Sequence, residues 1–164
     1  MLGSCSPSVR GFAVQCSGVC GSSSKGCRGV AIHQLKHATR LVRAARGARR
    51  RARAPFSGFK VGAAIETIDG TIVTGCNIEN ASYGLTMCAE RVAMFKALSE
   101  GHRRFRRIVV VADTAAPTPP CGACRQILWE FGGDLEVILA NLRRVTGRMR
   151  LGELLPLPFD ARLL

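Results

Sequence analysis

The chain has 164 residues, of which 47% are apolar, and a formal net charge of +13. This length suits one compact domain with its own core. No apolar run approaches the roughly eighteen residues that a membrane span needs, which argues against a transmembrane protein. Eight cysteines could form a disulfide scaffold, but no signal-peptide segment is visible. A CxxC pair near a carboxylate favours metal binding in a reducing compartment instead.

The positive charge is concentrated at the start of the chain. Residues 1–53 hold eleven Lys or Arg and no Asp or Glu, whereas residues 54–164 hold thirteen Lys or Arg against eleven acids. The later part is therefore nearly neutral, at +2. This distribution weighs against nucleic-acid binding by the main body of the protein.

Residues 1–30 are rich in Gly, Ser and Cys and show no periodicity. They are predicted to be a disordered basic tail in front of a domain that spans residues 31–164. An Arg-containing, Ser-rich, acid-free segment also fits a mitochondrial or plastid transit peptide. A solvated tail on a cytoplasmic protein is the preferred interpretation.

Apolar residues at helical spacing predict an amphipathic helix over residues 32–53, ended by Pro55. Its arginine-rich face could contact nucleic acid, but a solvated face is favoured because no aromatic residues are interleaved for stacking. Strands are predicted at 61–68, 71–78, 108–112 and 135–140, and helices at 88–100 and 121–131. The stretch after residue 140 gives no clear pattern, apart from a short leucine-rich segment at 151–155. Alternating strands and helices of this length indicate a three-layer α/β domain.

Three thiols and one carboxylate suggest a catalytic zinc site. Cys88, Cys121 and Cys124 would supply three ligands and leave the fourth position of the ion for water. Each segment lies where a loop meets a predicted helix, and a helix N-terminus stabilises thiolates. Glu90 follows Cys88 by two residues and is the candidate proton shuttle.

A closed structural site is the alternative, with Cys76 as the fourth thiolate. Such sites usually come as two CxxC pairs, whereas Cys88 is solitary, so the catalytic interpretation is favoured. Cys76 is then expected to be a buried strand residue.

Three thiolates around Zn²⁺ leave the site with a net charge of −1, which should weaken the metal as a Lewis acid. Arg91 is therefore predicted to donate to the thiolate sulfurs and to restore the acidity of the metal. Arg125 directly follows Cys124 and is a second positive group available to the cluster. The alternative for either arginine is pairing with Glu130 or other surface acids, and for Arg125 the two possibilities have equal weight.

Five segments together resemble the small homotetrameric cytidine deaminases of pyrimidine salvage. They are APFSGFKVGAA (54–64), GCNIENASY (75–83), CAER (88–91), PCGACRQ (120–126) and ELLP (153–156). The resemblance implies a three-layer α-β-α cytidine-deaminase-like fold with a mixed central sheet of about five strands. It also implies one Zn²⁺ per subunit. The lack of a long apolar run, noted above, predicts no membrane partner. The implied activity is the hydrolysis of cytidine and deoxycytidine to uridine and deoxyuridine.

The resemblance further implies that Asn77 and Glu79 bind the ribose hydroxyls, which suits an amide and a carboxylate two residues apart at the end of a strand. Phe59 would pack near the base, and Tyr83 and Phe159 would complete the active site of a neighbouring subunit. Without the resemblance, a turn-forming polar pair and ordinary core packing explain these residues as well. Two small residues, Ala81 and Ala89, complete the implied substrate contacts.

The chain departs from the family pattern at several positions, and three other functions are alternatives to a cytidine deaminase. Arg53 stands where the family has an aromatic residue and Phe56 where Tyr is common, and the basic extension has no counterpart in the family. Blasticidin-type deaminases share the zinc motif, but are expected to lack the Asn77 and Glu79 pair. A nucleic-acid editing deaminase would more usually have His as its first ligand. A zinc-stabilised binding module would not depend on Glu90.

Overall fold

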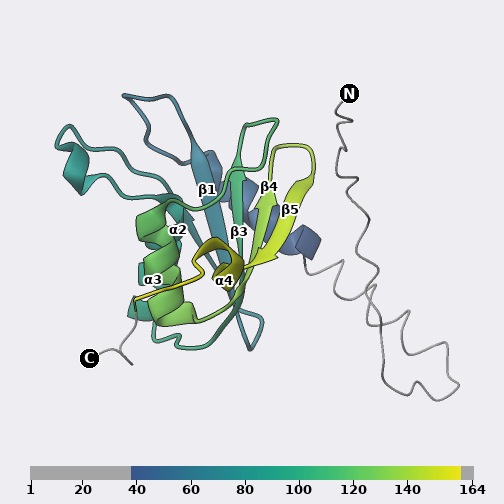
Figure 1. Cartoon of the computed structure of the whole chain (residues 1–164). Helices are drawn as coiled ribbons and strands as arrows, with labels where there is room; N and C mark the ends of the chain where they lie inside the picture. Colours follow the sequence, from purple (N-terminus) through teal and green to yellow (C-terminus); the bar gives the residue numbers. More distant parts are fainter. Residues whose placement is uncertain (1–37, 160–164) are drawn as a thin grey trace, which may run out of the picture.

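A computed structural model describes residues 38–159 of the chain. Its centre is one five-stranded sheet in the order β2-β1-β3-β4-β5 (Figure 1). Only β3 and β4 pair in parallel, and the other neighbours are antiparallel. The strands are β1 (Val61–Thr67), β2 (Ile72–Cys76), β3 (Phe105–Ala112), β4 (Glu136–Ala140) and β5 (Val145–Arg150).

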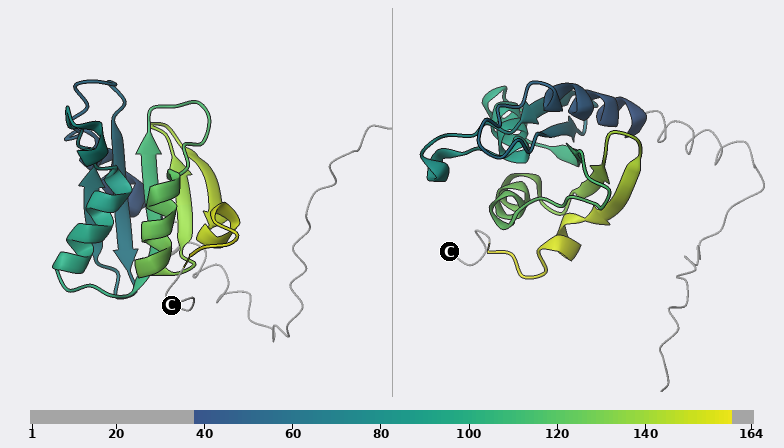
Figure 2. Two further views of the ribbon diagram at one scale, coloured as in Figure 1. Left: turned by 60° about the vertical axis from the view of Figure 1, so that its left-hand side comes forward. Right: turned by 90° about the horizontal axis from the view of Figure 1, so that it is seen from above.

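Helices cover both faces of this sheet. The helices α2 (Ala89–Ser99) and α3 (Gly122–Gly132) lie side by side on one face (Figure 2). An N-terminal helix, helical over the described residues 38–49, lies on the other. Two short helices, η1 (Tyr83–Leu85) and α4 (Leu151–Leu154), sit in the connections. The predicted three-layer α-β-α fold with a mixed sheet of five strands is confirmed.

Strand β3 is buried on both faces, as its run of β-branched residues predicts. Ile108 and Val110 belong to the core under α2 and α3, while Val109 and Val111 belong to the core under the N-terminal helix. All four are at most 2% exposed. This alternation follows from the period of two in a strand and places β3 at the centre of the molecule.

The backbones of the helices come very close to the sheet at two glycines. A Cβ atom on Gly62 would lie 2.2 Å from the carbonyl oxygen of Ala45, in the N-terminal helix. One on Gly75 would lie 2.4 Å from the backbone nitrogen of Ala93, in α2. These two glycines therefore set how closely the layers pack.

The predicted boundaries that differ most from the structure are the start of β3 and the end of the N-terminal helix. Strand β3 begins at Phe105 rather than at residue 108. The N-terminal helix ends at residue 49 rather than 53, because Arg53 is drawn into backbone pairing. Its N–H donates to the carbonyl of Asn77 (3.0 Å) and its carbonyl accepts from the N–H of Glu79 (2.8 Å).

Strand β5 was not predicted. The predicted tail and transit-like segment at 1–30 lie outside the described residues, and within these no helix is long and apolar enough to cross a membrane.

Candidate active site

The three predicted zinc ligands come together at the start of two neighbouring helices. Cys88 is the N-cap residue of α2, Cys121 is the N-cap residue of α3, and Cys124 follows one turn into α3. Their sulfur atoms all lie within 4.8 Å of one another, and those of Cys88 and Cys121 are 3.9 Å apart. Sulfurs held tetrahedrally at about 2.3 Å from one Zn²⁺ would be about 3.8 Å apart. The cluster therefore fits a zinc ion with three thiolate ligands.

The cluster also favours the thiolate form. A hydrogen bond from the Cys124 thiol, followed by one from Arg91, lowers the pKa of Cys88 to about 5. The pKa of Cys124, the proton donor in that pair, is raised in turn. Both N-caps expose free backbone N–H groups and the positive end of a helix dipole, which further stabilise negative sulfur. At least one thiolate is thus present for a metal to bind.

Cys76 is not part of this cluster. It lies half-buried at the end of β2, and among the described residues the metal-sized group contains Cys88, Cys121 and Cys124 alone. Within residues 38–159 no fourth thiolate closes the site, which favours the catalytic interpretation over a structural one.

Glu90 lies in the first turn of α2, two residues after Cys88. Its side chain is buried, with a residue exposure of 5%, and this burial raises its pKa to about 7. A carboxyl group that titrates near neutral pH can both accept and release a proton at that pH. Its place beside the cysteine cluster matches the predicted role of proton shuttle.

Arg91 contacts the cluster directly. Its Nη2 lies 3.7 Å from the sulfur of Cys88 and donates to the carbonyl of Thr86 at 2.9 Å. Within residues 38–159 it forms no ion pair with Glu130. The geometry therefore supports donation to sulfur rather than surface pairing.

Arg125 behaves differently from both expectations for it. It donates to the carbonyl of Pro120, just before Cys121, and to that of Leu154, both at 2.8 Å. It thus ties the cysteine loop to the C-terminal segment and has no contact with the sulfurs or with Glu130 in the described part of the chain. The next residue, Gln126, donates to the carbonyl of Phe159.

Asn77 and Glu79 follow β2 and are both held by the segment that precedes β1. The Asn77 amide accepts from the N–H of Val61 and donates to the carbonyl of Phe59, both at 2.8 Å. Glu79 accepts from the backbone N–H groups of Phe56 (2.8 Å) and Ser57 (3.2 Å) and from the Ser57 hydroxyl. That hydroxyl, followed by the Phe56 N–H, holds the pKa of Glu79 below its usual range. Both side chains are therefore fixed in place.

An open cavity of about 370 Å³ adjoins Glu79. It is lined by Phe56, Ser57, Glu79, Tyr83 and Thr86. Because the carbonyl of Thr86 accepts the hydrogen bond from Arg91, this cavity neighbours the cysteine cluster. Sequence reasoning did not assign a role to Ser57 or Thr86, because an isolated hydroxyl residue in a loop carries no distinctive signal.

The predicted aromatic residues are all exposed. Phe59 is 43%, Phe159 59% and Tyr83 78% exposed, and the rings of Tyr83 and Phe56 meet edge to face with centroids 6.2 Å apart. Ala81 is also exposed, whereas Ala89, the first residue of α2, is fully buried. One chain thus assembles the cysteine cluster, but does not bring Phe159 into the cavity beside Glu79.

A family model described as the cytidine and deoxycytidylate deaminase zinc-binding region matches residues 35–140. The match spans more than half of the chain and includes all three clustered cysteines. The chain belongs to this family. The deaminase fold, the cysteine cluster and the family together show a zinc-dependent hydrolytic enzyme with one zinc per chain.

The relatives of this deaminase are similar over most of their length. It is 52% identical over 122 residues to the cytidine deaminase of Halalkalibacterium halodurans, covering 74% of this chain and 92% of the relative. It is 49% identical over 122 residues to that of Sporosarcina psychrophila, covering 74% and 90%. The crystal structure of cytidine deaminase from Burkholderia pseudomallei matches with a TM-score of 0.71 and 51% identity, covering 74% and 98%.

Proposed function

We propose that this enzyme hydrolyses cytidine and deoxycytidine to uridine and deoxyuridine in pyrimidine salvage. The observation that carries the proposal is the open cluster of Cys88, Cys121 and Cys124 with the buried Glu90 beside it. The substrate class is supported by the relatives named cytidine deaminase, at 49–52% identity.

The chemistry requires an activated water and a proton carrier. Zinc held by the three cysteines would lower the pKa of a bound water toward about 7. Glu90 would take a proton from the attacking water, give it to N3 of the base, and help to protonate the amine that leaves C4. Burial of Glu90 keeps bulk water from competing in this transfer.

Glu79 and Asn77 would recognise the sugar. A carboxylate offers about four acceptor positions, and three of those on Glu79 are taken by Phe56 and Ser57. One acceptor remains for a sugar hydroxyl. The Asn77 amide likewise keeps one donor, because only one of its two N–H bonds is used within the described residues. The remaining acceptor on Glu79 and the remaining donor on Asn77 could bind a hydroxyl that ribose and deoxyribose share.

The complete site would be shared between subunits of a homotetramer. Phe159 lies on an exposed C-terminal segment whose carbonyl is held by Gln126, and Phe95 and Phe131 form a partly exposed edge-to-face pair on α2 and α3. Exposed aromatic residues of this kind are typical of contact surfaces between chains. Assembly would bring Phe159 of one chain over the base bound by its neighbour.

Glu90→Gln provides the test. The wild-type protein should contain one zinc per chain and deaminate cytidine and deoxycytidine, but neither blasticidin S nor single-stranded DNA. Glu90→Gln should keep its zinc, measured by atomic absorption, and lose turnover by at least about a hundredfold. Substantial residual turnover would contradict the role of Glu90, and preferential deamination of blasticidin S or DNA would contradict the substrate assignment.

A further inference from the structure

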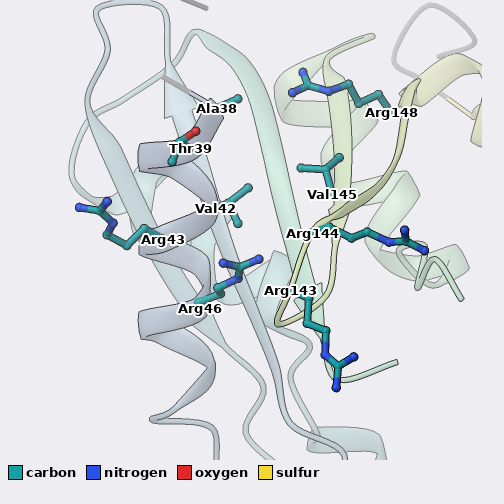
Figure 3. Close-up of a pocket in the computed structure, with 9 residues that line it drawn as sticks. All are labelled: Ala38, Thr39, Val42, Arg43, Arg46, Arg143, Arg144, Val145 and Arg148. Carbon is teal, nitrogen blue, oxygen red and sulfur yellow. The ribbon is translucent and has the colours of Figure 1, made fainter. Parts of the chain in front are cut away.

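A second cavity, of about 360 Å³, lies between the N-terminal helix and the β4–β5 hairpin (Figure 3). We call it the arginine pocket. Its lining comprises Ala38, Thr39, Val42, Arg43, Arg46, Arg143, Arg144, Val145 and Arg148. None of these residues belongs to the cysteine cluster or to the cavity beside Glu79. The N-terminal helix that forms one wall covers the face of the sheet opposite α2 and α3.

The charge of this pocket is almost uncompensated. Five of its nine lining residues are arginines. Among the described residues, the only carboxylate paired with any of them is Glu136, which lies 3.0 Å from Arg148 and is shared with Arg107 at 3.3 Å. Five arginines on the walls of one cavity make the electrostatic potential there positive, and this potential attracts an anion.

Asn141 joins the two walls of the pocket. Its backbone carbonyl accepts from Nε and Nη2 of Arg46, at 3.1 and 3.0 Å. Its side-chain oxygen accepts from the backbone N–H groups of Arg143 and Arg144, and its amide nitrogen donates to the carbonyl of Thr114. The hairpin loop is thus fixed against the helix, so the pocket is formed before any ligand binds.

Two arginines point into the space between the walls. Figure 3 shows Arg46 extending from the helix toward the hairpin at one end of this space and Arg148 extending from β5 toward the helix at the other end, whereas Arg43, Arg143 and Arg144 project away from it. Arg46 is held by Asn141 and Arg148 by Glu136, yet each guanidinium has five N–H donors and keeps several free. Val42 and Val145 supply apolar surface beside these donors.

We propose that the arginine pocket binds a small phosphate-bearing ligand, with Arg46 and Arg148 gripping its phosphate groups. Guanidinium groups match phosphate oxygens in a two-pronged geometry, and arginine clusters are the usual means of holding phosphate. The volume lies in the range of small-molecule sites and can accommodate a nucleoside phosphate or a short phosphate chain. A nucleic acid fits less well, because a backbone-binding groove is extended and lined with aromatic residues for base stacking, and this pocket has none.

The proposal can be tested by calorimetric titration of the full-length protein at pH 7.5 and constant ionic strength in chloride. The probes are inorganic phosphate, pyrophosphate, adenosine triphosphate and a single-stranded oligonucleotide. One molecule of pyrophosphate or adenosine triphosphate should bind per chain. Arg46→Gln and Arg148→Gln should each weaken that binding at least tenfold, because each removes a charged donor to phosphate. Arg104→Gln, which removes the same charge just before β3, at the opposite end of the parallel strands β3 and β4 from the β4–β5 loop, should change it less than twofold.

Two controls separate loss of the site from loss of the fold. The Arg148 side chain is 43% exposed, so Arg148→Gln should keep the circular dichroism spectrum and cytidine turnover of the wild type. If Arg46→Gln unfolds, the binding measured for Arg148→Gln tests the proposal alone. Tighter binding of pyrophosphate than of inorganic phosphate would assign the pocket to phosphate chains, and equal binding to a single phosphate group. The proposal is wrong if the wild type binds neither pyrophosphate nor adenosine triphosphate, if Arg104→Gln weakens binding equally, or if only the oligonucleotide binds.

Discussion

At the scale of single residues, we expect Arg91 to influence how well a cluster of three thiolates can serve catalysis. Three negative sulfurs would make an ion that they bind less electrophilic, and the Arg91 guanidinium, 3.7 Å from the sulfur of Cys88, would withdraw part of that negative charge. Its second hydrogen bond, to the carbonyl of Thr86, fixes the guanidinium in this position. Arg91 thus sits between the metal cluster and the cavity beside Glu79.

Replacing Arg91 by Gln should lower kcat for cytidine by about 10- to 100-fold, because the charge that supports the metal is lost. The zinc content should stay near one per chain, since all three ligands remain, and KM should change little. Steady-state kinetics and metal analysis measure both effects. Arg91→Lys keeps the charge and should recover part of kcat. An unchanged kcat in Arg91→Gln would show that Arg91 does not tune the metal.

The residues around the metal could be predicted from the sequence, because ligand chemistry restricts residue type and spacing. The CxxC pair and the Cys-Ala-Glu segment predict the cluster and its neighbour Glu90 without any knowledge of the fold. The role of Ser57 could not be predicted in this way. Its hydroxyl reaches Glu79 only because residues 54–58 fold back against the end of β2, a contact across 22 positions of the chain.

At the scale of elements, the position of α2 depends on Gly75. This glycine lies in β2 directly beneath the helix, where a Cβ atom would meet the carbonyl oxygen of Ala89 at 2.5 Å and the nitrogen of Ala93 at 2.4 Å. Both contacts are with backbone, which cannot move aside as the end of a side chain can. The helix that positions Glu90 therefore requires glycine at this point of the strand.

Gly75→Ala should destabilise the protein by about 1–3 kcal/mol, as overpacking against a rigid neighbour does. It should also reduce turnover, since α2 must shift away from the sheet and Glu90 moves with it. Thermal unfolding of the zinc-loaded protein measures the first effect. Gly47→Ala is the matched control, because a Cβ there has its nearest neighbour, the end of the Arg50 side chain, at 3.8 Å. In a helix that change should stabilise by about 0.5–1 kcal/mol, and equal melting temperatures for the two variants would refute the argument.

The elements predicted from the sequence are those with a local signal. β3 has its uninterrupted β-branched run, and α2 and α3 have a loop before them and a glycine near their ends. β5 has the sequence VTGRMR, which is exposed, basic and interrupted by glycine, and it becomes a strand only by pairing along β4. The helix boundary at residue 49 likewise depends on the pairing of Arg53 with the segment after β2. Such long-range pairing is not visible in a local pattern.

At the scale of the whole molecule, the proposed shared active site requires residues from two neighbouring chains. In the proposed mechanism Glu90 and the cysteines would act within their own chain, whereas Phe159 would act in the site of a neighbour. Two defective chains, one with Glu90→Gln and one with Phe159→Ala, should then complement one another in a mixed assembly. A site is complete when it combines Glu90 of one parent with Phe159 of the other.

Mixed tetramers formed by co-expression should have up to about one quarter of wild-type activity, because about a quarter of random neighbour pairs have the required combination. Each parent alone should be far less active, and Phe159→Ala should fold normally since that ring is 59% exposed. Differently tagged parents allow the mixed species to be purified before assay. Activity no greater than the average of the two parents would place Phe159 in the site of its own chain.

The spacing of the cysteines gives the metal a role beyond catalysis. Cys88 and Cys121 are 33 positions apart, and β3 runs between them through the centre of the sheet. An ion bound to both sulfurs therefore acts as a cross-link that closes this loop around the central strand. By the chain-entropy argument for cross-links, a loop of this length restricts the unfolded chain by about 3–4 kcal/mol. The ion that activates the water would thus also hold α2 and α3 together. Binding of the metal would stabilise the fold, and the fold in turn would hold the three ligands in place for the metal.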